Sequence, residues 1–388
     1  MPETPDFMTD HVRAGIEEAS GRHCAKITLG EAVPKPGDLV LQTNDYLDIA
    51  GHPAIVRAKV DALVAEGHGD SISRVFAHHR DDAHRVFERR VARMMGAEDA
   101  VMTTSGYSAN VGLIEAFAVP GHPVYLDQRA HASLWAGTAC GQAKAVPFRH
   151  NNAEDLAAKI AHYGPGLVVI DSLYSTNGAI APIADMVAAA EAGGCAIAVD
   201  ETHAFGCHGQ DGAGLVAALG LSDRVHFRTL GLSKAMAARG GLIACSTENA
   251  EYFRYEARSM IFSTSVLGYE VAGFDAALDI IAEETWRTDI LHKRHAALKA
   301  ALLDAGIDVT DSDSQIIAIV TGDNARTRDF RDGLIERGVH GSVFLPPATP
   351  HGKSLIRLTL NARLSAANVE KVADACAAVT ARLEPVPA

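Results

Sequence analysis

Long hydrophobic runs are absent from this sequence of 388 residues. A transmembrane helix needs about 18 or more consecutive apolar residues, and no stretch reaches that length. The opening residues, MPETPDF, also lack the basic and apolar segments of a secretory signal. We therefore expect a cytoplasmic protein with no stable membrane association.

Cysteine is scarce and scattered. The six cysteines form no CxxC pair, whereas disulfide frameworks and zinc sites both need close, paired spacing. A zinc site at His203, Cys207 and His208 would lack a second ligand pair, so we expect no metal. The cysteine pattern favours a reducing compartment.

Basic residues are outnumbered by acidic ones. Lys and Arg total 35 against 48 Asp and Glu, which gives a formal net charge of −13. Such a charge repels the phosphate backbones of nucleic acids. The N-terminal segment offers no DNA-binding module, so we expect no nucleic-acid partner and disfavour a transcriptional regulator.

A regular alternation of short apolar runs and helical periodicity fills the middle of the chain. Helical patterns cover 109–117, 134–141, 153–163 and 183–192, and the apolar runs between and beyond them lie at 100–102, 124–126, 167–170, 196–199, 225–227 and 242–244. Short, continuously apolar strands separated by helices predict a mainly parallel sheet covered on both faces, which is an α/β fold.

The two ends of the chain depart from this alternation. The first 50 residues are largely polar, and the last hundred place three apolar strands beside charged helices. A chain of this length predicts two or three domains. We predict an N-terminal arm over 1–50, a large domain over 51–285 and a small C-terminal α+β domain over 286–388.

Two residues carry the clearest chemical signal. The strand 196–199 ends at Asp200, and ligands of open α/β sheets bind beyond the carboxyl ends of the strands. By itself Asp200 could be a buried carboxylate paired with an arginine, and Lys234 a solvated surface charge. Together they fit pyridoxal phosphate, because Lys234 would bind the aldehyde and Asp200 would keep the pyridine nitrogen protonated.

Three further loops could complete such a site. The phosphate group needs N–H donors at a helix N-terminus, and Ser105, Gly106 and Tyr107 open a predicted helix. His131 follows a strand and could stack on the ring, although a histidine there is more often a helix-start residue. Ser175 also follows a strand and could serve the ring hydroxyl.

Four motifs in order, HASLWAG, STNG, VDETHAFG and LGLSKA, resemble the α-oxoamine synthase family of fold type I pyridoxal phosphate enzymes. The resemblance runs from Asn44 through Arg357. It implies a seven-stranded, mainly parallel sheet in the large domain and a C-acyltransferase that condenses an amino acid with an acyl-CoA. It also implies a homodimer with the active site at the subunit boundary.

The resemblance assigns roles to single positions. The catalytic residues it implies are Lys234, His131 and Asp200. It assigns substrate carboxylate binding to Asn44 and Arg357. The residues that it implies for cofactor binding are Lys234, Asp200, His203, His131, Ser175, Ser105, Gly106, Tyr107 and Thr229.

Departures from the family pattern indicate the subfamily. SISRVFA at 71–77 stands where other members have a glycine-rich GSR stretch, Gly231 replaces a threonine, and Leu364 replaces a histidine. With LQTNDYL and GSVF, these departures resemble the CqsA-type synthases of α-hydroxyketone quorum-sensing autoinducers.

That resemblance implies a medium- or long-chain acyl-CoA and a small amino acid of the 2-aminobutyrate or S-adenosylmethionine type, joined into an α-aminoketone autoinducer precursor. An 8-amino-7-oxononanoate synthase or a sphingoid-base synthase is an alternative that shares every cofactor residue. A fold type I aminotransferase is a further alternative.

Overall fold

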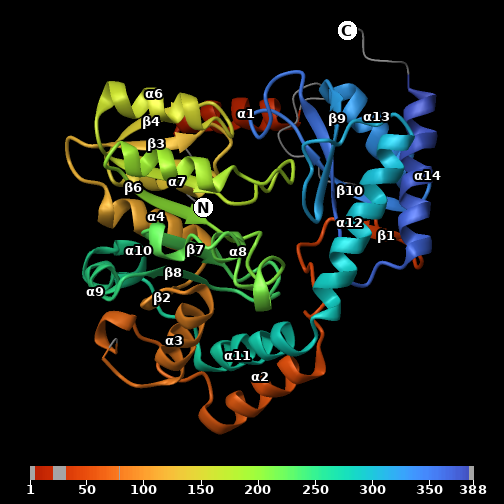
Figure 1. Ribbon diagram of the computed structural model, residues 1–388. Coiled ribbons are helices and arrows are strands. Elements are labelled where there is room, and N and C mark those ends of the chain that lie inside the picture. Colours follow the sequence, from red (N-terminus) through yellow and green to blue (C-terminus); the bar gives the residue numbers. More distant parts are fainter. Residues whose placement is uncertain (1–4, 21–31, 78, 384–388) are drawn as a thin grey trace.

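The computed structural model describes residues 5–20, 32–77 and 79–383. Two sheets organise the chain, and Figure 1 shows them side by side: the larger runs from orange through yellow to green, and the smaller is blue except for the orange-red strand β1 (Leu39–Leu41). Within the described residues, no helix is long and apolar enough to cross a membrane, and no group of three or more His, Cys, Asp or Glu could hold a metal ion.

The larger sheet has seven strands in the order β2-β8-β7-β6-β5-β3-β4. Only β8 runs antiparallel to its neighbours, so the prediction of a mainly parallel seven-stranded sheet is confirmed. Its strands are β2 (Asp99–Thr103), β3 (Pro123–Asp127), β4 (Lys144–Phe148), β5 (Leu167–Asp171), β6 (Ala196–Asp200), β7 (Phe227–Gly231) and β8 (Gly241–Cys245).

Helices cover both faces of this sheet. Along β5, Val168 and Ile170 belong to one apolar cluster while Leu167 and Val169 belong to another, as the two-residue period of a strand requires. The Leu167 face packs against α4 (Gly106–Phe117), α5 (Ala132–Cys140), α9 (Thr247–Glu256) and α10 (Arg258–Ile261). The opposite face packs against α6 (Ala153–Tyr163), α7 (Ile183–Ala192) and α8 (Leu215–Ala218), with α2 (Pro53–Glu66), α3 (Ala83–Met95) and α11 (Gly268–Glu283) around the β2 end of the molecule.

The smaller sheet has four strands in the order β1-β10-β11-β9. Its strands are β1 (Leu39–Leu41), β9 (Ile316–Gly322), β10 (Val339–Phe344) and β11 (Ser354–Thr359), and its helices are α12 (Trp286–Asp304), α13 (Asn324–Ile335) and α14 (Ala366–Arg382). Because β1 pairs in parallel with β10, part of the N-terminal segment belongs to this sheet. We propose a large unit over 51–285 and a small unit over 286–388, with β1 of the 1–50 arm added to the small sheet.

Two strands differ from the sequence analysis. The pattern 225–227 predicted a strand, but β7 begins only at Phe227 because the 3₁₀ turn η3 (Ser222–Arg224) precedes it. The edge strand β4 was missed, since alternate residues of it face solvent and Pro147 interrupts it. The remaining elements are α1 (Asp6–Ser20), η1 (Arg74–Phe76) and η2 (Gln210–Gly212).

Candidate active site

Four parallel strands end at one edge of the larger sheet. β6 ends at Asp200, and Lys234 follows the end of β7 by three residues. His131 follows the end of β3, and Ser175 follows the end of β5. Because the carboxyl ends of parallel strands meet at one edge, the loops after them form a single site.

Asp200 is buried, with 6% of its surface exposed. One carboxylate oxygen accepts a hydrogen bond from Asn110 Nδ2 at 2.6 Å, and the other accepts one from the Thr202 backbone N–H at 2.8 Å. The carboxylate–arginine pair considered as an alternative exists one residue further on, where Glu201 pairs with the buried Arg228. Asp200 itself has no ion-pair partner among the described residues, so its charge is available to a cationic ligand.

Asn110 joins three of the predicted residues, and the sequence analysis did not assign it a role. Its Oδ1 accepts a hydrogen bond from Thr229 Oγ1 at 2.6 Å, and its Nδ2 also donates to Ser133 Oγ at 2.8 Å. Ser133 in turn lies 2.7 Å from Nδ1 of His131. The available signal was a carboxamide among mostly apolar residues in the helix that begins at Gly106.

His203 is held by a residue from the N-terminal segment. The Tyr46 hydroxyl lies 2.5 Å from His203 Nδ1, and both side chains are buried. Burial, followed by the charges of Lys234 and Arg357, holds the pKa of His203 well below its usual range. Burial also raises the pKa of Tyr46, which keeps its hydroxyl protonated. In the tautomer that accepts from Tyr46 at Nδ1, the neutral imidazole carries its proton on Nε2 and can donate from there.

Lys234 and Arg357 form the cationic side of the site. Burial and the nearby Arg357 lower the pKa of Lys234, while Asp200 opposes this effect. Arg357 donates from Nη1 to the Ser175 carbonyl at 2.8 Å, and its guanidinium lies 4.7 Å from the centroid of the Phe344 ring. Its Nε is buried and has no hydrogen-bond partner among the described residues. An unpaired N–H on a buried cation is suited to a carboxylate ligand.

The N-terminus of α4 lies against the loop that carries Lys234. A Cβ built on Gly106 would lie 2.7 Å from the Gly231 Cα, so this close approach requires glycine at 106. Ser105 caps the helix by accepting from the Ser108 backbone N–H at 3.0 Å. The Tyr107 side chain is 52% exposed.

Two predicted residues contribute less than expected in side-chain contacts. Ser175 contacts Arg357 through its backbone carbonyl. The Asn44 side chain lies at the margin of the site, with its Oδ1 3.4 Å from the Tyr46 hydroxyl. Asp200, Thr229 and His131 are joined through Asn110 and Ser133, and His203 is held by Tyr46.

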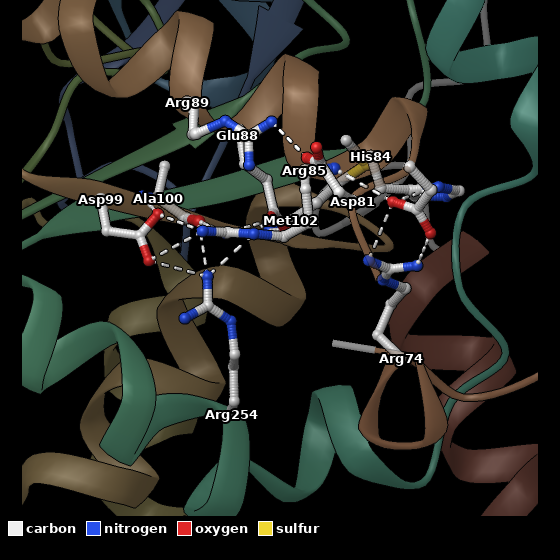
Figure 2. A network of polar contacts seen from close by, with 11 residues as sticks. Arg74, Asp81, His84, Arg85, Glu88, Arg89, Asp99, Ala100, Met102 and Arg254 are labelled. Carbon is white, nitrogen blue, oxygen red and sulfur yellow. Dashed lines mark hydrogen bonds and ion pairs between the residues drawn. The ribbon is translucent and has the colours of Figure 1, made fainter. Parts of the chain in front are cut away.

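The segment 71–77, here called the entrance loop, is fixed by a fork of two hydrogen bonds. Arg74, which is 7% exposed, donates to the two carboxylate oxygens of Asp82 at 2.6 and 3.2 Å. Figure 2 shows this fork beside a second network, in which Arg85 and Arg254 both bind Asp99. Both networks lie on or against α3, so the entrance loop rests on a rigid support.

The geometry fits pyridoxal phosphate. The buried Asp200 lacks a cation, the first N–H groups of α4 have no intrahelical partners, and Lys234 lies within electrostatic reach of both Asp200 and Arg357. A carboxylate for the pyridine nitrogen, a helix N-terminus for the phosphate group and a lysine for the aldehyde are the three features that the cofactor requires. The fold and the site therefore define a fold type I pyridoxal phosphate enzyme.

Comparison with known proteins gives the family. The model of "Aminotransferase class I and II" matches residues 36–376, and the chain belongs to this family. The chain is 37% identical over 343 residues to the CAI-1 autoinducer synthase of Vibrio campbellii, covering 88% of this chain and 87% of that protein. It is 36% identical over 349 residues to the 8-amino-7-oxononanoate synthase of Anaeromyxobacter dehalogenans, with 89% and 87% covered.

A solved structure agrees with both relatives. A lysine-to-alanine variant of the serine palmitoyltransferase of S. paucimobilis, determined with a bound pyridoxal phosphate–myriocin aldimine, superposes with a TM-score of 0.88 at 28% identity, covering 98% of this chain and 99% of that one. These relatives are α-oxoamine synthases, so the expected family, fold class, cofactor and enzyme class are confirmed.

Proposed function

We propose that this enzyme condenses a medium- or long-chain acyl-CoA with a small amino acid, of the 2-aminobutyrate or S-adenosylmethionine type, into an α-aminoketone precursor of an autoinducer. The observation that carries the reaction type is that Lys234 and Arg357 lie close enough to interact electrostatically. The Nε of Arg357 is buried and has no hydrogen-bond partner among the described residues. The similarity to the CAI-1 autoinducer synthase supports the product class.

Each residue then has a specific task. Arg357, with Asn44 beside it, binds the amino acid carboxylate and brings the α-carbon toward Lys234. Bound pyridoxal phosphate supplies an electron sink for that carbon. Lys234, whose pKa is lowered by burial, accepts and returns the proton. When the cofactor is bound, His203 would donate from Nε2 to its ring hydroxyl oxygen, with Ser175 as a second partner of that oxygen, and His131 would stack on the ring.

The cofactor's remaining contacts come from the ends of α4 and β7. Ser105, Gly106 and Tyr107 would bind the phosphate group at the helix N-terminus, and Thr229 would act on Asp200 through Asn110, which is hydrogen-bonded to both. As the new C–C bond forms, the C–S bond of the thioester breaks and coenzyme A leaves as the thiol. The bond from the α-carbon to the carboxyl group then breaks, the carboxyl group leaves as CO2 and a proton takes its place, which gives the α-aminoketone. The free thiols Cys140, Cys195, Cys207, Cys245 and Cys376 support a cytoplasmic location.

The entrance loop supports an aliphatic acyl chain over a dicarboxylic one. A distal carboxylate would need a cation, and Arg74, which lies in this loop, is already bound by Asp82. An unpaired carboxylate in a desolvated channel carries a large free-energy cost. Each buried methylene instead contributes about 0.8 kcal/mol of transfer free energy, so longer chains bind better.

Catalytic efficiency is therefore expected to rise from butanoyl-CoA to octanoyl- and decanoyl-CoA and to be low with succinyl- and pimeloyl-CoA. Steady-state kinetics with these five thioesters, together with mass spectrometry of the products, measures this order. A preference for succinyl- or pimeloyl-CoA would overturn the proposal in favour of another α-oxoamine synthase. Conversion of the cofactor to its amine form by amino acid alone would indicate an aminotransferase.

We also propose a homodimer whose interface includes the entrance loop and the end of α10. Ser73 donates to the Ile261 carbonyl and Ser265 N–H to the Ile72 carbonyl, at 2.5 and 2.9 Å, which places the entrance loop beside the end of α10. On these segments Phe76 is 71% exposed and Phe262 80% exposed. Large apolar side chains gathered on one surface are typical of subunit interfaces.

Phe262→Lys is expected to shift the protein toward monomer and to increase cofactor release on dilution, because it places a charge in the proposed interface. Sedimentation velocity and absorbance of the released cofactor measure the two effects. Val119→Lys is the control. Val119 is 57% exposed, and it follows the C-terminal end of α4, outside the entrance loop and α10. A fully active monomer of the unaltered protein would disprove the dimer.

A further inference from the structure

Thr202 is a polar residue of the candidate active site that has no task in the proposed reaction. It follows Asp200, the last residue of β6, by two positions and is half-buried. Its backbone N–H donates to one carboxylate oxygen of Asp200 at 2.8 Å. Its Oγ1 accepts a hydrogen bond from the Gly231 backbone N–H at 2.8 Å. Thr202 therefore joins the loop after β6 to the loop that carries Lys234.

The hydroxyl group of Thr202 has a hydrogen that the protein does not use. A hydroxyl has one hydrogen to donate and two lone pairs that accept. The bond from Gly231 uses a lone pair, and the hydrogen has no acceptor in the part of the chain that the structure describes. Because the residue is only half-buried, this O–H group is available to a ligand.

The Thr202 side chain lies beside the N-terminus of α4. A Cβ built on Gly231 would lie 2.9 Å from Thr202 Cγ2, 3.3 Å from Thr202 Oγ1 and 3.5 Å from the Gly106 Cα. The three residues therefore meet in one small space. Gly106 is the first residue of α4, and the free N–H groups of a helix N-terminus favour an anion. The unused hydrogen of Thr202 is close to the place where such an anion would bind.

Glycine at position 231 makes room for the Thr202 side chain. Gly231 is one of the departures from the family pattern, and its φ lies outside the left-handed region, so the backbone itself does not require glycine. A Cβ only 2.9 Å from Thr202 Cγ2 would force one of the two side chains to move. Since β6 and β7 are parallel neighbours, with Asp200 opposite Thr229, either strand could supply a side chain here. In this chain the hydroxyl comes from Thr202.

We propose that the Thr202 hydroxyl donates to the phosphate group of the cofactor, an inference that rests on the proposed place of that group at the N-terminus of α4. The residue would then serve both ends of the cofactor, since its N–H group also holds Asp200. A hydrogen bond to a charged phosphate oxygen is stronger than one between neutral groups. The bond that Oγ1 accepts from Gly231 polarises the hydroxyl and strengthens its donation.

The test compares pyridoxal phosphate with pyridoxal, two aldehydes that differ only in the phosphate group. Thr202→Val keeps the shape of the side chain without its hydroxyl. The dissociation constant of pyridoxal phosphate is expected to rise about tenfold or more in this variant, since a hydrogen bond to a charged group is lost. That of pyridoxal should stay within about threefold, because pyridoxal has no phosphate contact to lose. Absorbance titration of the full chain, after removal of the cofactor, measures both constants.

Thr202→Ser separates hydrogen bonding from packing. It keeps the hydroxyl but loses the methyl group, so we expect it to bind both aldehydes like the unaltered protein. Thr138→Val is the matched control, because it removes a buried hydroxyl that donates to the Leu134 carbonyl at 2.9 Å within α5. Its two dissociation constants should not change. A loss in Thr202→Ser without one in Thr202→Val, or an equal rise for both aldehydes in Thr202→Val, would overturn the proposal.

Ser105→Ala distinguishes failure of this inference from failure of the proposed phosphate site. If this variant weakens the binding of pyridoxal phosphate alone while Thr202→Val has no effect, the phosphate group lies at α4 but Thr202 does not bind it. If neither variant discriminates between the two aldehydes, the proposed phosphate site is refuted together with the role of Thr202. Neither titration uses an acyl-CoA, so the result does not depend on the proposed substrates.

Discussion

Lys234→Ala is expected to lower kcat by a factor of roughly 10²–10⁴ or more, because proton transfer by a positioned group contributes about that much and covalent attachment of the cofactor is lost as well. The free energy of unfolding should change little. The charge of Arg357 lowers the pKa of Lys234, and the charge of Lys234 lowers the pKa of His203. Removing this amine relieves the repulsion with Arg357 and also removes the attraction to Asp200, so the two effects on the folded state oppose each other.

The measurement combines turnover, thermal unfolding and chemical labelling. Borohydride reduction of the cofactor-loaded protein, followed by peptide mapping, should place the label on Lys234. Lys371→Ala, at an exposed position on α14, should keep both turnover and label. A label on another lysine, or turnover of Lys234→Ala within tenfold of the unaltered protein, would show that Lys234 has been assigned wrongly.

The residues predicted from sequence are those whose position depends on one strand and the loop after it. Asp200 and Lys234 could be found because a parallel strand ends at a fixed edge of its sheet, whatever surrounds it. The same local argument predicted most strands and helices. It failed for β4, whose exposed residues and Pro147 hide the apolar pattern of a buried strand.

The residues that were missed act through partners far away in the sequence. Asn110 contacts Asp200 across 90 positions, and Tyr46 contacts His203 across 157. Pairing between Leu39 and Val339 likewise depends on how the two ends of the chain meet. Such contacts are set by tertiary packing, which leaves no periodic trace in the local sequence.

The second large effect concerns the two carboxyl groups at the ends of β5 and β6. Asp171 and Asp200 are direct partners in the register of these strands. Burial, and then the charge of Asp200, raises the pKa of Asp171 well above its usual range. Asp171 therefore keeps its proton to a higher pH than an ordinary carboxyl group does. The Asn110 amide and the Thr202 N–H both donate hydrogen bonds to Asp200.

Asp200→Asn is accordingly expected to lower kcat by about 10²–10³, the loss typical of removing one preorganised electrostatic contact. It should also weaken cofactor binding, since the pyridinium loses its counter-charge.

Asp171→Asn is the matched control. It replaces a carboxyl group whose pKa burial raises with a neutral amide of the same shape, whose oxygen can still accept from the His131 backbone N–H, a contact of 3.0 Å. Its kcat should stay within about tenfold of the unaltered enzyme, because no transition-state charge is removed. Steady-state kinetics and a cofactor titration of both variants measure the difference. Equal losses in the two would mean that packing at the strand ends, and not the charge of Asp200, sets the rate.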